Sequence, residues 1–366
     1  MSQDVISCSQ HDSSFFYHRC IATIEGHSSY ISSLAIGGQF LYTGSSDNEI
    51  RLYNRTEITS DVDQQSLADN MVITGNGAVK SIVVSADKLF TAHQDHKIRV
   101  WKINTQQTQQ NKLAHLATLP TLGDRALKIL IPKHYVQVRR HKKSTWVHHL
   151  DTVSALALSN DGSLLYSVSW DKTLKIWQTA DFKCLESVAS AHDDSINALV
   201  LSSNGEVYTG STDRKIKIWR KTLEGEDHIL VATLEKHKSG VNALALSADE
   251  NTLYSGGSDR WIVVWEKNMD GNMVAVDSLK GHNKSILCLS VVSDLVCSGS
   301  ADETIRIWRG IEKCYFCLAI LEGHRGPVKC LTLVKDDDEP SDNSYLIYSG
   351  GLDCDIKVWQ IFIPST

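Results

Sequence analysis

Proline is scarce in this chain, with five in 366 residues, and no long polar tract occurs. Both features favour a folded chain in which disorder is confined to short segments. No apolar stretch approaches the roughly 18 residues that a membrane span requires, so we expect none. Residues 1–18 contain neither a basic start nor an apolar run, and they do not resemble a secretory signal.

The charge balance and the cysteines exclude further classes. Lysine and arginine number 37 against 43 acidic residues, and this net charge of −6 gives the whole chain no reason to bind nucleic acid or an anionic membrane. The nine cysteines are odd in number and lack regular spacing, which favours reduced thiols over a disulfide framework. We therefore expect a protein of the cytoplasm, the nucleus or both, with no metal site and no cofactor.

The chain is rich in internal repetition. Seven copies of one pattern end near an aromatic residue: Tyr53, Trp101, Trp177, Trp219, Trp265, Trp308 and Trp359. Six residues before each aromatic stands an aspartate: Asp47, Asp95, Asp171, Asp213, Asp259, Asp302 and Asp353. Four residues before each aspartate stands a serine or threonine: Thr43, Thr91, Ser167, Thr209, Ser255, Ser298 and Ser349. Such regularity fixes the architecture before any single element is assigned.

Six copies also carry a histidine four residues before a β-branched residue that opens an apolar run: His27, His149, His192, His237, His282 and His324. The second copy has Gly75 in that place. Each copy then alternates short runs rich in Val, Ile, Leu and Tyr with turns of Ser, Asn, Asp and Gly, a pattern typical of strands. No copy contains a helix-length amphipathic segment, so the sequence predicts an all-β fold.

These copies resemble WD40 repeats over residues 20–363. The resemblance implies a seven-bladed β-propeller in which the four recurring side chains form one hydrogen-bonded network per blade. Complete sets would be His149, Ser167, Asp171, Trp177; His192, Thr209, Asp213, Trp219; His237, Ser255, Asp259, Trp265; His282, Ser298, Asp302, Trp308; and His324, Ser349, Asp353, Trp359. Because blade one has Tyr53 instead of tryptophan and blade two lacks the loop histidine, we expect these two blades to be less rigid.

The start of the chain predicts how the ring closes. Residues 18–24 match the fourth strands that precede other repeats, such as 317–321, and each is followed by Glu-Gly-His. We expect this segment to complete blade seven from outside and so to remove an open sheet edge. The predicted organisation is a flexible tail at 1–17, a propeller at 18–363 and a short tail at 364–366.

One insertion distinguishes this chain from a generic propeller. Residues 121–148 lie between blades two and three, on the top face, which we define as the face that carries the histidine loops and the aspartate turns. From 120 to 149 the segment holds seven basic residues and one acidic residue, Asp124. Its stretch KHYVQVRRHKK at 133–143 resembles the insertion of JINGUBANG-type plant WD-repeat proteins. That resemblance implies a plant regulatory protein that acts through protein partners in developmental or hormone-linked control.

Seven residues are candidates for partner binding: Lys133, Arg139, Arg140, Lys142, Lys143, Trp146 and Trp170. The basic loop would attract an acidic or phosphorylated partner, with Trp146 as an aromatic anchor. Alternatively, the loop folds over its own acidic propeller or is solvated. Trp170 precedes a turn aspartate and should lie near the central opening, where it either contacts a partner or, as we favour from the repeat pattern, packs beside the turn.

Histidine, serine and aspartate in one network are also the residue types of a catalytic triad. Five or more copies, one per blade, indicate a scaffold instead, because catalysis would single out one copy. The sequence therefore predicts a non-catalytic protein-interaction scaffold or regulator, monomeric within a complex, that uses the top face and the basic loop. The alternative is a binder of nucleic acid or phosphoinositide in which the loop neutralises phosphates.

Overall fold

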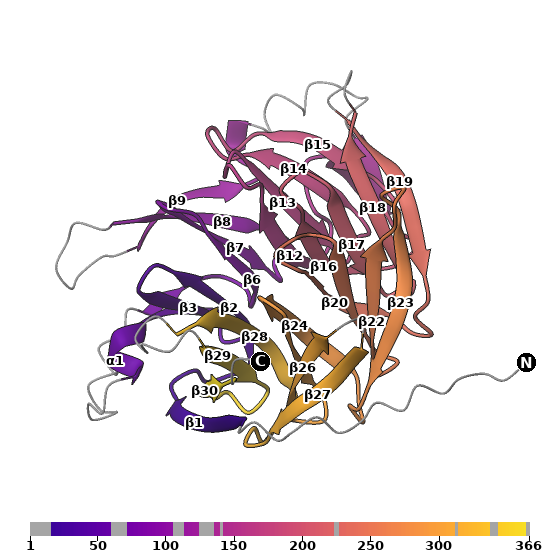
Figure 1. The fold of residues 1–366 in the computed structure, drawn as a ribbon. Coiled ribbons are helices and arrows are strands. Elements are labelled where there is room, and N and C mark those ends of the chain that lie inside the picture. The colour runs from indigo at the N-terminus through magenta and orange to yellow at the C-terminus, as the bar shows by residue number, and fades with distance from the viewer. Residues whose placement is uncertain are drawn as a thin grey trace, which may run out of the picture.

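Seven four-stranded antiparallel sheets stand around one centre as the blades of a ring (Figure 1). The computed structural model describes residues 16–59, 72–104, 113–123, 135–139, 142–222, 227–311, 314–336 and 343–363. Within these ranges the only helix with assigned bounds is α1 (Arg55–Thr59), which follows the third strand of blade one. The predicted all-β, seven-bladed fold is confirmed.

Each blade runs from an innermost to an outermost strand. Blade one holds β2 (Ile31–Gly37), β3 (Phe40–Ser45), β4 (Glu49–Asn54) and β5 (Val72–Thr74). Blade two holds β6 (Val79–Val84), β7 (Lys88–His93), β8 (Ile98–Ile103) and β9 (Leu113–Leu119). Blade three holds β12 (Val153–Leu158), β13 (Leu164–Ser169), β14 (Leu174–Gln178) and β15 (Cys184–Val188).

The remaining blades repeat this order. Blade four holds β16 (Ile196–Leu201), β17 (Val207–Ser211), β18 (Lys215–Lys221) and β19 (His228–Glu235). Blade five holds β20 (Val241–Leu246), β21 (Thr252–Gly257), β22 (Trp261–Lys267) and β23 (Met273–Lys280). Blade six holds β24 (Ile286–Val292), β25 (Leu295–Ser300), β26 (Ile305–Ile311) and β27 (Cys314–Leu321). Blade seven holds β28 (Val328–Lys335), β29 (Ser344–Gly351), β30 (Ile356–Phe362) and, outermost, β1 (Tyr17–Ile24).

Apolar side chains between neighbouring blades form the core. Between blades three and four, for example, Tyr166 and Ile176 pack with Ile196 and Trp219. The second strand of each blade is covered on both faces, and in β25 all six residues are buried. Because each fully buried aliphatic or aromatic side chain contributes about 1.5–3 kcal/mol, these interfaces supply most of the driving force for closing the ring.

A bulge in each innermost strand points one side chain toward the centre of the ring. The strand register shifts around the second residue of the strand in all seven blades: Ser32, Lys80, Ser154, Asn197, Asn242, Leu287 and Lys329. We call this the bulge position. In four blades the bulge side chain donates a hydrogen bond to the first carbonyl of the next innermost strand: Ser32 to Val79, Ser154 to Ile196, Asn197 to Val241 and Asn242 to Ile286. These contacts join neighbouring blades around the central channel.

The turn between the second and third strands has the same strained backbone in all seven blades. The residue after each turn aspartate adopts φ between 67° and 73°: Asn48, His96, Lys172, Arg214, Arg260, Glu303 and Cys354. A left-handed conformation is unfavourable for most of these residue types. The aspartate stabilises it by accepting the amide hydrogen two residues further on, as from Lys215 to Asp213 at 2.9 Å.

The N-terminal segment closes the ring as predicted. The indigo β1 lies beside the yellow β30 in Figure 1, paired from Tyr17 with Phe362 to Ile24 with Ile356. The Arg19 guanidinium adds two hydrogen bonds to the Gln360 side chain, at 2.7 and 3.0 Å. On the inner side, β2 of blade one contacts β28 of blade seven. The strand begins one residue before the predicted boundary, while residues 1–15 and 364–366 lie outside the described residues.

Three buried cysteines lie in the core of blades six and seven. Cys288, Cys297 and Cys330 are free thiols there. Burial raises the pKa of Cys288 to about 12, so its thiol stays neutral. No helix in the described ranges is long and apolar enough to cross a membrane.

Deleting residues 1–24 should make the protein insoluble or lower its melting temperature strongly. The deletion exposes the edge of β30 and removes the outer strand of blade seven. The measurement is thermal unfolding followed by circular dichroism, with a deletion of residues 1–15, which spares β1, as the matched control. Melting of the longer deletion within a few degrees of the full chain would show that β1 does not hold the ring closed.

Candidate functional site

A hydrogen-bonded network recurs inside the blades. In all seven, a histidine Nε2 lies 2.8 Å from the hydroxyl of the serine or threonine on the second strand. In the six blades that have the tryptophan, its indole N–H donates to the same hydroxyl at 2.8–3.0 Å. The hydroxyl accepts from the indole and can donate to the imidazole, so each polar atom has a partner in the blade interior.

The other imidazole nitrogen, Nδ1, faces the turn aspartate. It lies 2.8–3.0 Å from the nearer carboxylate oxygen in blades one, four, five, six and seven. Four of the five predicted sets therefore come together as continuous networks, those headed by His192, His237, His282 and His324. Because the aspartate also accepts hydrogen bonds from backbone amides, the network ties the entry loop of a blade to its turn and third strand.

Blade three departs from the predicted set. His149 Nδ1 is 3.4 Å from Asp171 and 2.9 Å from the Thr173 hydroxyl, which donates to Asp171 at 2.6 Å. Thr173 therefore stands between the two predicted partners. Blade six contains the same type of residue in Thr304, which also donates to its aspartate, but there His282 keeps its direct contact.

Blade two corrects the expectation that it lacks a histidine. His93, two residues after Thr91 on β7, places Nε2 against the Thr91 hydroxyl and Nδ1 2.9 Å from the Gly77 carbonyl. The ring is fully buried, and the position of the missing loop histidine is held by Gly75, where a Cβ would lie 3.5 Å from the His93 ring. Blade one keeps His27, Thr43 and Asp47, and its buried Tyr53 replaces the tryptophan. Whether these two blades are less rigid stays a prediction.

Burial decides the protonation state of the network. Desolvation lowers the pKa of five of its histidines, against the opposing effect of their hydrogen bonds: His27, His93, His149, His192 and His282. For His93 the pKa falls to about 4. Desolvation alone would raise the pKa of Asp302, but hydrogen bonds from the Thr304 hydroxyl, the Asn283 amide and His282 outweigh it and lower this pKa to about 2. Near neutral pH these five imidazoles are thus neutral and Asp302 is ionised.

This geometry resembles a catalytic triad but offers no access to a substrate. Ser255 and Ser298 are fully buried, and each hydroxyl is already engaged by a tryptophan and a histidine. A nucleophile must reach its substrate, which these hydroxyls cannot do. His27, Asp47 and Glu49 bring three potential metal ligands within 4.8 Å, but both nitrogens of His27 are occupied by Asp47 and Thr43. These side chains therefore hold the fold.

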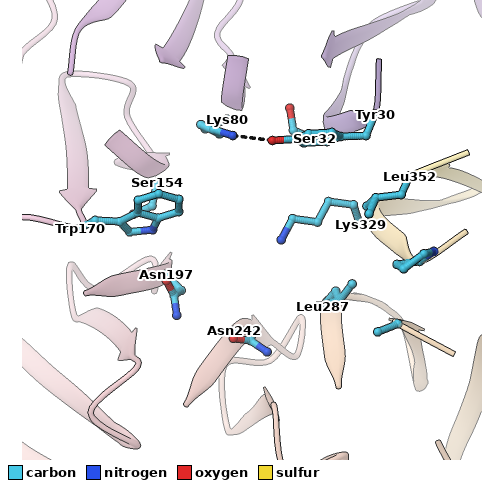
Figure 2. A pocket seen from close by; sticks show the side chains of 12 residues that line it. Tyr30, Ser32, Lys80, Ser154, Trp170, Asn197, Asn242, Leu287, Lys329 and Leu352 are labelled. Atoms are coloured by element: carbon cyan, nitrogen blue, oxygen red, sulfur yellow. Dashed lines mark hydrogen bonds between the residues drawn. The ribbon is translucent and has the colours of Figure 1, made fainter. Parts of the chain in front are cut away.

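An open site lies at the centre of the top face. A cavity of about 520 Å³ is lined by side chains from all seven blades, and Figure 2 shows Lys80, Lys329 and Trp170 around it. All seven bulge positions line it, joined by Tyr30, Trp170, Ala301, Pro327 and Leu352. The bulge positions were not predicted as site residues, although they follow the β-branched residue that opens each apolar run, and alignment of the seven copies groups them.

Trp170 and Trp146 differ in what they can contact. The Trp170 side chain is 40% exposed at the cavity wall, so part of it is open to a partner. Whether it contacts a partner or only packs beside the turn stays a prediction. Trp146 is half-buried against the core between blades two and three, and its carbonyl accepts a hydrogen bond from the buried Lys175 at 2.5 Å. Trp146 therefore packs within the fold and does not present a free anchor.

The basic insertion is only partly within the described residues. Its hairpin consists of β10 (Tyr135–Arg139) and β11 (Lys142–Thr145), which places the backbones of Arg139, Lys142 and Lys143 on two paired strands. Lys133 and Arg140 lie outside the described residues. The insertion runs from β9 to β12, between the outermost strand of blade two and the innermost strand of blade three.

A closed ring of seven sheets, each with a buried histidine–hydroxyl pair, defines a β-propeller with a central channel. The family model for the WD domain, G-beta repeat, matches residues 18–54, 140–178, 182–220, 229–266, 273–309 and 315–360, more than half of the chain. The chain therefore belongs to the WD40 family. The matched segments leave out blade two, the blade in which His93 replaces the loop histidine.

Curated relatives share the repeats at low identity. Apoptotic protease-activating factor 1 of Danio rerio is 24% identical over 358 residues, which cover 93% of this chain and 27% of that protein. Autophagy-related protein 16 of Arabidopsis thaliana is 24% identical over 280 residues, covering 72% of this chain and 53% of the relative. An uncharacterised WD repeat-containing protein of Schizosaccharomyces pombe is also 24% identical, over 57% of this chain and 62% of its own length. The chain thus spans about a quarter and about half of the first two relatives.

Replacing His93 with alanine should destabilise the protein by about 2–3 kcal/mol, because the Gly77 carbonyl and the Thr91 hydroxyl each lose a buried partner. Urea unfolding followed by tryptophan fluorescence measures the loss. The matched control is His115→Ala, which removes an exposed histidine of β9 in the same blade. Equal stability of the two variants would contradict the role of His93.

Stability should fall as the pH falls from about 6.5 toward 4. The unfolded chain takes up protons near pH 6.5, whereas the folded histidines have lowered pKa values, so acid favours the unfolded state by about 1.4 kcal/mol per pH unit for each such histidine. The aspartates extend the loss below pH 4. Melting temperatures at pH 7.5, 6.5, 5.5 and 4.5 test this, with His93→Gln expected to reduce the slope. A melting temperature that stays constant or rises from pH 7 to 5 would exclude it.

Proposed function

We propose that this chain is a non-catalytic interaction module that holds partner proteins at the top-face opening of its propeller. The single observation that carries the proposal is the exposed Trp170 beside a cavity to which every blade contributes a side chain. Tryptophan dominates binding energy at protein interfaces when it can be desolvated by a partner. The surrounding turns belong to a rigid scaffold, which limits the entropy cost of binding.

The basic insertion would supply a second contact on the same face. Its seven basic residues suit an acidic or phosphorylated segment of a partner, because the remainder of the chain is acidic. The tie between Lys175 and Trp146 anchors the end of the insertion to blade three. A partner could in this way contact the opening and the insertion together, and such paired contacts strengthen binding.

The relatives support an interaction role without defining its pathway. Their printed names concern protease activation during apoptosis and autophagy, and in each case the matched part is only a segment of the relative. We propose that this chain acts as a monomeric propeller within a complex in the cytoplasm, the nucleus or both. The resemblance of its insertion to JINGUBANG-type proteins supports a regulatory role in plant development or hormone-linked control.

The alternative is a binder of nucleic acid or phosphoinositide that uses the basic insertion to neutralise phosphates. Such binding would weaken steeply between low and moderate salt, because each neutralised phosphate releases a counterion. The net charge of −6 over the whole chain opposes a polyanion, so we favour the protein partner.

Trp170→Ala should reduce the recovery of partners by at least roughly tenfold, the effect of losing an interface hot spot. Proximity labelling or pull-down with the full chain measures this, beside a variant with Arg139, Arg140, Lys142 and Lys143 changed to Gln. Met269→Ala is the matched control, because it removes a fully exposed apolar side chain from the β22–β23 turn on the opposite face. Recovery of the same partners by the wild type and both variants would reject the proposed surface.

A further inference from the structure

The central cavity carries positive charge and no negative charge. Two of its twelve lining residues are Lys80 and Lys329, and none is an aspartate or glutamate. The two lysines occupy the bulge positions of blades two and seven, which flank blade one on either side. In a chain with a net charge of −6, two cations directed into one opening create a local anion-binding field.

In the described structure, neither lysine makes the hydrogen bond to the next innermost strand that serine and asparagine make at the bulge position. Where the bulge residue is serine or asparagine, its side chain links neighbouring blades; where it is Lys80, Leu287 or Lys329, other groups make the link. The Ser81 hydroxyl accepts from the Leu156 amide at 3.2 Å, joining blades two and three. The thiols of Cys288 and Cys330 point at carbonyls of the next blade, at 3.6 and 3.7 Å. The bulge side chains of blades two, six and seven thus line the cavity without donating a hydrogen bond to the next innermost strand.

The two ammonium groups are held differently. Lys80 Nζ donates to the Tyr30 hydroxyl at 2.8 Å and also lies 5.2 Å from the centre of the Tyr30 ring. Within the described residues, Lys329 forms no hydrogen bond or ion pair and its side chain is exposed, and Figure 2 shows it reaching into the cavity. The pKa of Tyr30 is lowered: burial would raise it, but hydrogen bonds with Lys80 and Ser46 and the charges of both lysines outweigh burial. Both cations therefore act on the same part of the opening.

The rest of the wall is apolar or uncharged. Trp170 and Leu352 stand directly before the turn aspartates of blades three and seven and are 40% and 46% exposed. Figure 2 shows Trp170 and Leu352 on opposite sides of the cavity, with Asn197, Asn242 and Leu287 along the wall between them. A site that combines two cations with apolar walls matches an anionic side chain flanked by apolar residues. A polynucleotide instead presents a charge on every nucleotide and needs a continuous track of cations.

We propose that the opening binds a peptide segment of a partner by enclosing one anionic side chain, a glutamate, an aspartate or a phosphorylated residue, between Lys80 and Lys329. Apolar residues beside that side chain lie against Trp170 and Leu352. This inference rests on the proposed function and adds the chemistry of the ligand. The lysines supply charge-assisted hydrogen bonds, which are stronger than neutral ones, and the tryptophan supplies apolar contact.

Four oriented libraries of nine-residue peptides test the proposal, with the central residue set to Glu, phosphoserine, Gln or Lys and the flanking positions randomised. Retention on the immobilised full chain should be at least roughly tenfold higher for the Glu or phosphoserine library than for the Gln library. The comparison between those two anionic libraries tells a carboxylate from a phosphate. The preference should disappear in K80Q/K329Q.

The matched control is K238Q/K280Q, which removes the same charge near the top face but at blade five, where both lysines lie within 5 Å of the Trp261 ring centre. This variant should keep the anionic preference. Equal retention of the Glu and Gln libraries by the wild type would overturn the inference. It would also be overturned if both double variants kept the anionic preference, or if both lost it. Unchanged melting temperatures of the two variants establish that they fold.

The outcomes separate the inference from the proposed function. If the wild type retained all four libraries equally and Trp170→Ala retained none, the preference for an anionic side chain would be rejected. The top-face binding site would still be supported. Retention of no library would overturn both. A third outcome is that no peptide is retained but the wild type binds a single-stranded 20-mer oligonucleotide or vesicles with phosphatidylinositol bisphosphate. If K80Q/K329Q lost this binding, the cavity would be a site for nucleic acid or phosphoinositide.

Discussion

The structure depends on a buried hydrogen-bonded network that recurs in every blade. A hydroxyl on the second strand contacts a histidine and, in six of the seven blades, accepts a hydrogen bond from an indole. Each network joins three parts of a blade that are far apart in sequence, as in His324, Ser349 and Trp359. A buried polar group without a partner costs about 1–3 kcal/mol, so a displacement of the loop, turn or strand that breaks the network is unfavourable. That constraint holds the top-face turns in place, and with them the opening that the turns surround.

The networks act within blades, whereas the bulge side chains act between them. Asn197 and Asn242 each donate to the next blade at 2.8–3.1 Å, so the inner ring has polar links in addition to its apolar core. Because the two sets of contacts are separate, the side chains that line the channel can differ between blades and serve in binding. A blade that gains its link from another group, such as Ser81 or Cys330, can place a side chain of any chemistry at the bulge position without opening the ring.

Sequence spacing predicted the number of blades and the closure by residues 18–24, because both follow from a pattern repeated seven times. It did not predict His93, because this histidine comes from the second strand, where other copies carry small residues such as Ser45, Ser211 or Gly257. The loop carries Gly75 at the position of the histidine, and a Cβ there would come into van der Waals contact with the His93 ring. Spacing also does not give the exposure of Trp170, because the place of Asp171 in the network does not determine which way the adjacent side chain points. Alignment of the seven copies groups the cavity lysines with the other bulge positions, but spacing alone does not tell that this position faces the central channel.

The charge distribution distinguishes the top face from the rest of the protein. The chain carries more acidic than basic residues, yet the insertion and the two lysines of the cavity are cationic, and both belong to the face with the aspartate turns. The turn aspartates are not among the residues that line the cavity; Asp213, for example, is held within its own blade by His192 and by the amides of Asp193 and Lys215. The acidic segment that we propose as a ligand would therefore be repelled by most of the surface and attracted at the opening, where Trp170 would supply the short-range contact that steering alone lacks.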